Sequence, residues 1–274
     1  MSVCKFCGQN AGLFKSVHKE CVIAYETGKI AIVNDTYQAV RDGKDFGTLE
    51  TEVNNRAANS YIKSYELTEL YNQGLDKAIE SFLEDGIITS EEEKKIETFK
   101  THFSNNSLDQ RESFQKVVKS LIIRDVLEDK VPTRVKIATD LPFLMQKDET
   151  VIWLFMSVEC YEQRTKITYE GRSQGVSVRI ASGLYYRTGS FKGNPVASEQ
   201  AVLLGSGMLA LTNKNLYFGS SSKTFKTPYN KLISITPYSD GIGLQKDGVS
   251  AKPQIFKPLD GWFAYNLISN LHKR

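Results

Sequence analysis

Three of the four cysteines in this sequence lie within its first 21 residues, beside one of its three histidines. They form two pairs with two residues between the partners, Cys4 with Cys7 and His18 with Cys21. In a Cys-x-x-Cys turn both thiolates can bind one cation, and Gly8 then offers a residue that tolerates positive φ. On a helix, a spacing of three residues puts His18 and Cys21 on one side. The sequence therefore predicts a four-ligand Cys3His site, a donor set typical of tetrahedral structural zinc.

The segment around these pairs is too short to fold by apolar burial alone. Ten residues separate Cys7 from His18, enough for a short hairpin in which Leu13 and Phe14 form a small core. Over residues 1–25 the sequence resembles a treble-clef or zinc-ribbon knuckle. Because four protein ligands leave no coordination position for water, we assign no catalysis to the metal.

Two other uses of the cysteines are disfavoured. A redox Cys-x-x-Cys pair is the main rival, but no βαβ pattern surrounds it and a second ligand pair is present. A disulfide is less favoured because the first residues, Met1 to Lys5, do not begin a secretory signal. Cys160 stands in an apolar stretch and is expected to be a buried, reduced thiol.

Length and composition describe an ordinary globular protein. The chain has 274 residues, which suggests about two domains, with 41% hydrophobic and 24% charged residues. Net charge is only +3, yet the charges are unevenly distributed. Residues 1–130 carry 17 Lys and Arg against 22 Asp and Glu, whereas residues 131–274 carry 18 against 10. An acidic half joined to a basic half indicates two distinct surfaces.

The acidic half has the periodicity of helices. A long helix is expected from Val17 to Gly43, where the glycine can end it. The acidic run Ser90–Glu93 is a start signal for a later helix. A further stripe recurs every four residues and predicts a packing seam: Leu49, Val53, Ala57, Tyr61 and Tyr65. We expect a zinc knuckle with its following helix over residues 1–43 and a helical bundle over residues 44–130.

The basic half, residues 131–274, has the alternation and glycine-rich turns of short strands. Strands are expected from residues 134–137 onwards. The segment Gly207–Gly219 predicts a hairpin whose turn contains Asn213 and Asn215, since Asn tolerates left-handed backbone. Asp260 can cap a closing helix with an apolar side.

This order, about seven strands and then one amphipathic helix, is similar to that of bacterial PH-like and GRAM-like domains. The motif that carries the resemblance is the hairpin, where Leu211-Thr212-Asn213 joins an apolar strand to an aromatic one. The resemblance implies a β-barrel closed at one end by the helix, with Trp262 as its plug; the alternative is that Trp262 is an exposed anchor. The expected fold class is thus α+β multidomain: a small zinc knuckle, a helical bundle, and a PH-like β-barrel with a C-terminal helix.

Basic residues of the second half gather around one expected strand. Alternation puts Val178 and Ile180 on one face and Arg179 on the other, with Arg187 and Lys192 near in sequence. The PH-like domains that bind phosphoinositides use basic residues of the first two strands and their loop, and the tight Lys…Arg-x-Arg spacing of those sites is absent from this sequence. A solvated basic face is the competing interpretation, because charge on one side of a sheet is ordinary.

These observations favour recognition over catalysis. The sequence has no Gly-rich phosphate loop, nucleophile elbow or open metal motif, so we do not expect an enzyme. We expect a non-enzymatic interaction or scaffold protein with a protein partner; the alternative is a peripheral membrane binder that recognises anionic lipid headgroups. Nucleic acid is not an expected partner because the basic residues are dispersed. The longest apolar run, Val151 to Val158, is far below the ~18 residues that span a bilayer, and a cytoplasmic protein is expected.

Overall fold

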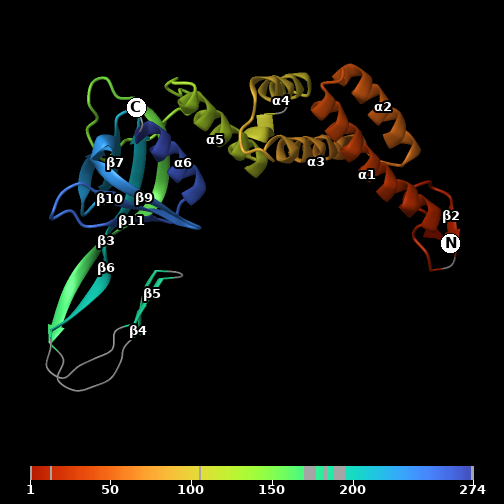
Figure 1. Cartoon of the computed structure of the whole chain (residues 1–274). Helices are drawn as coiled ribbons and strands as arrows, with labels where there is room; N and C mark the ends of the chain where they lie inside the picture. The colour runs from red at the N-terminus through yellow and green to blue at the C-terminus, as the bar shows by residue number, and fades with distance from the viewer. Residues whose placement is uncertain are drawn as a thin grey trace. The chain divides into compact units, whose positions relative to one another are not determined.

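The computed structural model of the chain describes residues 2–12, 14–104, 106–169, 177–181, 184–187 and 195–272. The chain divides into two compact units, Met1–Arg124 and Asp125–Arg274 (Figure 1). The first unit is helical apart from its amino end, and the second is built on a sheet. The finer division of the first unit into knuckle and bundle stays a prediction.

The first unit begins with a small ladder and continues as helices. Its elements are β1 (Ser2–Val3), β2 (Asn10–Gly12), α1 (Lys19–Asp42), α2 (Phe46–Asn59), α3 (Ser64–Phe82), α4 (Ser90–His102), the 3-10 helix η1 (Asn106–Gln110) and α5 (Glu112–Leu127), which crosses into the second unit. Gly43 ends α1 as expected, with φ at 68°. The start signal before α4 is a capping box of Thr89 and Glu92, one residue earlier than the expected Ser90.

One apolar cluster joins the helices of the first unit. It includes Leu49, Val53 and Ala57 of the expected seam. The seam stops there, because α2 ends at Asn59 and the two tyrosines that follow leave its stripe. Tyr65 is exposed, and Tyr61 lies in left-handed backbone with φ at 59°.

The helices α1 and α3 approach closely at Gly74. A Cβ on this glycine would lie 2.4 Å from Thr36 Cβ and 2.8 Å from the Val33 carbonyl oxygen. Thr36 is itself buried, and its hydroxyl donates to the Ile32 carbonyl at 2.8 Å, so it has little freedom to move. The absence of a side chain at residue 74 therefore sets the spacing of the two helices.

Gly74→Ala is expected to lower the free energy of unfolding by about 1–3 kcal/mol, since overpacking outweighs the better helix propensity of Ala. Gly47→Ala is the control, because the nearest atom to its Cβ is a side-chain oxygen of Asp45 at 3.3 Å. That variant should be neutral or stabilised by up to about 1 kcal/mol. Urea denaturation measures both, and equal effects would contradict the packing argument.

The second unit is organised around an antiparallel sheet of seven strands. In the order β8-β7-β6-β3-β11-β10-β9, these are β8 (Thr224–Pro228), β7 (Asn215–Ser220), β6 (Pro195–Thr212), β3 (Val151–Tyr169), β11 (Gln254–Lys257), β10 (Gly241–Lys246) and β9 (Leu232–Tyr238). A separate two-stranded ladder pairs β4 (Ser177–Ala181) with β5 (Leu184–Arg187). Residues 134–137, expected as a strand, lie outside the sheet.

The sheet is open, so the expectation of a closed barrel is wrong. Its edges are β8 and β9, which are joined by the 3-10 helix η2 (Tyr229–Lys231) and do not pair with each other. Pro228 at the end of β8 has no N–H for a ladder, and η2 carries the chain away before β9 begins.

The predicted hairpin is confirmed as β6 with β7, in register from Gly207 opposite Ser220 to Leu211 opposite Leu216. Its turn also holds the loop before β3. The Thr212 hydroxyl oxygen accepts from the Asn215 amide at 2.9 Å, and Asn213 Oδ1 accepts from the Thr150 amide at 2.9 Å. Thr212 and Asn213 of the Leu-Thr-Asn motif therefore stabilise the turn and the loop before β3.

A buried carboxylate lies beneath this turn. Glu149 accepts hydrogen bonds from the Thr212 and Tyr217 hydroxyls, the Asn215 amide group and the Gln146 backbone N–H. Burial acts to raise the pKa of Glu149, but these donors outweigh it and lower the pKa below 4.5. The charged form of Glu149 therefore stabilises the folded state.

The closing helix α6 (Gly261–His272) packs against β9 and β10. Asp260 caps it as expected, accepting from the Phe263 amide at 3.0 Å. Trp262 is 54% exposed, so its role as a plug is wrong. The buried residue is Phe263, whose ring lies 4.8 Å from that of Trp153 between centroids. Trp262 falls one position off the buried stripe of the helix.

Within the described residues, no helix combines the length and apolar character needed to cross a membrane. Cys160 is free and fully buried, as the sequence suggests, and burial raises its pKa to about 12.

Glu149→Gln is expected to lower the free energy of unfolding by about 1–3 kcal/mol at pH 7, because it removes a charge that accepts several hydrogen bonds. The folded pKa lies below 4.5, so this contribution is present above that pH and is lost as the pH falls through the folded pKa. The gap between wild type and variant should therefore shrink below about pH 4.5. The control is Asp148→Asn, an exposed carboxylate of the same loop; a pH-independent gap for Glu149→Gln would contradict the assignment.

Candidate metal centre

The first cysteine pair lies in a tight turn between β1 and β2. The ladder pairs Val3 with Asn10, and the Cys4 amide donates to the Gln9 carbonyl at 2.7 Å. The Gly8 amide donates back to the Cys4 carbonyl at 2.9 Å, with φ of Gly8 at 73°. The expected need for glycine after the second thiol is confirmed, because this φ strains other residues.

The second ligand pair stands at the start of α1. His18 is the N-cap in extended backbone, and Cys21 lies in the first turn. His18 thus precedes the helix, whereas the sequence placed it within. The spacing still brings the two side chains together, with 3.8 Å between Cys21 Sγ and His18 Nδ1.

The four predicted ligand residues converge. The nearest ligand atoms of Cys4, Cys7, His18 and Cys21 all lie within 4.8 Å of one another. His18 Nδ1 lies 3.3 Å from Cys7 Sγ, and the His18 backbone amide donates to Cys4 Sγ at 3.4 Å. A tetrahedral site with metal–sulfur bonds of about 2.3 Å has ligand atoms about 3.8 Å apart. The Cys3His cluster therefore has the size of a tetrahedral metal site.

The outer nitrogen of His18 is also occupied. His18 Nε2 lies 3.0 Å from the Asn10 carbonyl oxygen. If Nε2 carries the proton and donates to this carbonyl, Nδ1 is left unprotonated and faces the sulfurs. Ligating histidines commonly have such an outer partner, which fixes the ring and its tautomer.

Aromatic side chains rather than the expected hairpin core surround the Cys3His cluster. Phe6 lies between Tyr25 and Tyr61, with centroid distances of 5.0 and 6.0 Å. Phe14 is 102% exposed, so the expected core of Leu13 and Phe14 is wrong for Phe14, and Leu13 lies outside the described residues. Phe14 follows β2 and lies in left-handed backbone, with φ at 64°, outside the buried cluster of Cys4, Ala11 and Cys21.

Sequence reasoning missed Tyr61, whose side chain interacts with Cys21. Residue 61 follows the end of α2 and is far from the cysteines in sequence. Its left-handed backbone, not helical periodicity, directs it here. No spacing rule could have found this contact.

The electrostatics favour the thiolate of Cys4 and disfavour that of Cys21. Burial acts to raise the pKa of Cys4, but hydrogen bonds from the backbone of Cys7, His18 and Phe6 outweigh it and bring the pKa to about 6. The Asn10 carbonyl raises the pKa of His18, and burial raises that of Cys21. A cation at the cluster would offset the cost of burying several thiolates.

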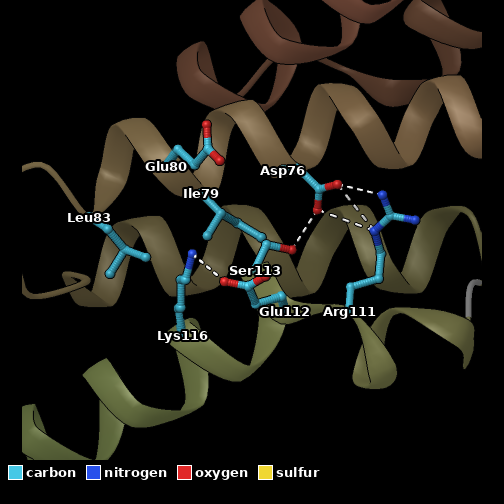
Figure 2. Close-up of a pocket in the computed structure, with 8 residues that line it drawn as sticks. All are labelled: Asp76, Ile79, Glu80, Leu83, Arg111, Glu112, Ser113 and Lys116. Carbon is cyan, nitrogen blue, oxygen red and sulfur yellow. Dashed lines mark hydrogen bonds and ion pairs between the residues drawn. The ribbon is translucent and has the colours of Figure 1, made fainter. Parts of the chain in front are cut away.

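A second polar cluster lines a cavity of about 290 Å³ between α3 and the start of α5 (Figure 2). Asp76 accepts from Arg111 at 2.5 Å and from the Ser113 hydroxyl, and Arg111 also reaches Glu69 at 2.9 Å. Lys116 pairs with Glu112 at 2.9 Å. Because these charges face one another, the cluster acts as a clamp between helices.

The predicted basic face falls in a region that is only partly described. The backbone register puts Arg179 opposite Tyr185 and Arg187 opposite Ser177 in the β4–β5 ladder. Lys192 lies outside the described residues. The basic face stays a prediction.

Comparison with protein-family models and with curated proteins found no match to this chain. The inference of function therefore depends on the geometry of the site.

Proposed function

We propose that the Cys3His cluster holds a structural zinc ion and that the chain is a non-enzymatic interaction protein. The observation that carries the proposal is the convergence of three thiols and one imidazole within 4.8 Å. Sulfur-rich sets of four are characteristic of structural zinc, and they leave no position for a substrate or water.

The need for a metal follows from how little apolar surface this end of the chain buries. β1 and β2 have two and three residues, and the buried residues here are Cys4, Ala11 and Cys21, two of which are ligands. Structural zinc contributes about 10–16 kcal/mol in finger peptides, enough to fold such a segment. The metal would then hold the knuckle against the first turn of α1.

Recognition by a protein partner is supported by exposed apolar side chains near the knuckle. Phe14 and Val3 belong to the knuckle, and Ile23 and Ile30 are exposed on α1. Exposed apolar side chains that form a contiguous patch mark interaction surfaces, and we propose that these residues contribute to one. The buried Glu149 carboxylate and the Asp76–Arg111 cluster both have internal hydrogen-bond partners, which also favours binding over chemistry.

The resemblance to PH-like domains remains part of this proposal. The seven-stranded antiparallel sheet, followed in the chain by one helix that packs on it, supports it. A second binding module of this kind would give the chain two recognition surfaces, one in each unit.

Purified protein is expected to contain one zinc ion per chain by elemental analysis, and Cys7→Ala should lose it. Cys160→Ala is the matched control, because Cys160 is a lone buried thiol in the other unit. Chelation should lower the melting temperature of wild type and speed amide exchange at the start of α1, because the ligands would lose their common bond. Wild type without zinc, or Cys7→Ala with as much as Cys160→Ala, would contradict the proposal.

Immobilised full-length chain is expected to capture a protein from a lysate of the native host. Phe14→Asp should weaken this capture about tenfold or more, since burial of a Phe side chain contributes about 1.5–3 kcal/mol. Leu144→Asp, an equally exposed apolar residue of the second unit, is the control. Capture unaffected by Phe14→Asp would refute the knuckle as the docking surface, provided zinc content and melting temperature are unchanged.

A further inference from the structure

The second unit contains a cavity of about 390 Å³ that the proposed function does not use. It is lined by residues of β3, β8, η2 and β10 and by the loop that follows β10. Four lysines line it: Lys226, Lys231, Lys246 and Lys252. Two carboxylates, Glu162 and Asp247, also take part. The volume falls within the range of small-molecule sites.

Thr227 lines this cavity, and its hydroxyl is buried in the wall. It is 2% exposed, and its Oγ1 has no hydrogen-bond partner among the described residues. Its backbone is fixed in β8, opposite Leu216 of β7, so the side chain cannot turn to solvent. A buried hydroxyl without a partner costs about 1–3 kcal/mol, which a ligand that accepts its proton would recover.

Lys246 holds a positive charge at the edge of the same cavity. It lies half-buried at the end of β10, 5.2 Å from the centroid of the Phe225 ring. Phe225 and Thr227 share one face of β8, so Lys246 approaches the face that carries the hydroxyl. Burial lowers the pKa of Lys246, and it forms no ion pair within the described part of the chain.

The nearby charge of Glu162 acts to raise the pKa of Lys246, and this carboxylate is shared with two other cations. Glu162 pairs with Arg164 at 2.7 Å and with Lys252 at 3.8 Å. Asp247 follows Lys246 directly, and its backbone amide donates to the Lys231 carbonyl at 2.7 Å, which holds η2 beside this loop. Lys231 and Lys246 both line the cavity, and neither forms an ion pair within the described residues.

We propose that this cavity binds a phosphate monoester, with the Thr227 hydroxyl donating to one oxygen and Lys246 and Lys231 neutralising the charge. A phosphate monoester carries nearly two negative charges and three acceptor oxygens at neutral pH, which suits two ammonium groups and one hydroxyl from different strands. A carboxylate has one negative charge and only two oxygens, so it would leave one of the two lysines without a counter-charge. The ligand is a free phosphate ester or the headgroup of a lipid, and both present the same group.

The test of the charge is a titration of the full chain with inorganic phosphate at constant ionic strength, followed by calorimetry. Lys246→Gln is expected to weaken binding about tenfold or more, as charge-assisted hydrogen bonds of about 1.5–3 kcal/mol predict. Lys214→Gln is the matched control, an exposed lysine in the β6–β7 turn that removes the same charge. Equal losses in the two variants, or no phosphate binding by wild type, would overturn the site.

The test of the hydroxyl is Thr227→Val, which keeps the shape of the side chain. Because Oγ1 has no partner, this variant should melt at or above the wild-type temperature without phosphate, yet bind phosphate about tenfold more weakly. A variant that binds phosphate as wild type does would refute the role of Thr227.

Vesicles separate the two sources of the ligand. Flotation compares vesicles that contain phosphatidic acid, whose headgroup is a phosphate monoester, with vesicles of phosphatidylcholine alone. Binding to the first alone, lost in Lys246→Gln and kept in Lys214→Gln, identifies a lipid. Binding of inorganic phosphate without vesicle binding identifies a soluble ester. Vesicle binding that both variants reduce equally would count against the cavity.

Discussion

The convergence of two separate ligand pairs at the first turn of α1 is the constraint on which the amino end depends. Cys4 and Cys7 come from a turn, whereas His18 and Cys21 come from a helix start. Little apolar surface is buried between these pieces, so their association needs another source of free energy. Backbone donors to Cys4 and the Asn10 carbonyl beside His18 prepare the donor atoms, and the Phe6 ring closes the cluster against Tyr25 and Tyr61.

Much of this arrangement is readable from sequence because it depends on local rules. The two-residue spacings, Gly8 in the turn, Gly43 at the helix end and Asp260 at the last helix are short-range features with known geometry. The hairpin of β6 and β7 is predicted for the same reason, because its turn residues and its two alternating strands are neighbours in the sequence.

The predictions that failed depend instead on contacts between residues far apart in the sequence. Whether β8 and β9 close a barrel depends on the curvature of the whole sheet, and these two strands, joined by η2, do not pair. Trp262 and Phe263 are neighbours on one helix, and only the position of the sheet decides which of them is buried. Tyr61 reaches the Cys3His cluster through a left-handed residue that periodicity cannot reveal.

Hydrogen-bond satisfaction distinguishes structural polar groups from groups available to ligands in this protein. Glu149 is buried and accepts from several donors, and Asp76 is similarly held by Arg111 and Ser113. Neither group has capacity left for a partner, so each stabilises packing. Thr227 is as deeply buried yet lacks an acceptor, and a native fold seldom retains such a cost without compensation. We propose that a ligand in the cavity provides this compensation; a water molecule there would not neutralise the charge of Lys246. A bound anion would accept a hydrogen bond from the Thr227 hydroxyl and also neutralise the Lys246 ammonium group. It therefore accounts for both groups, which lie on β8 and β10.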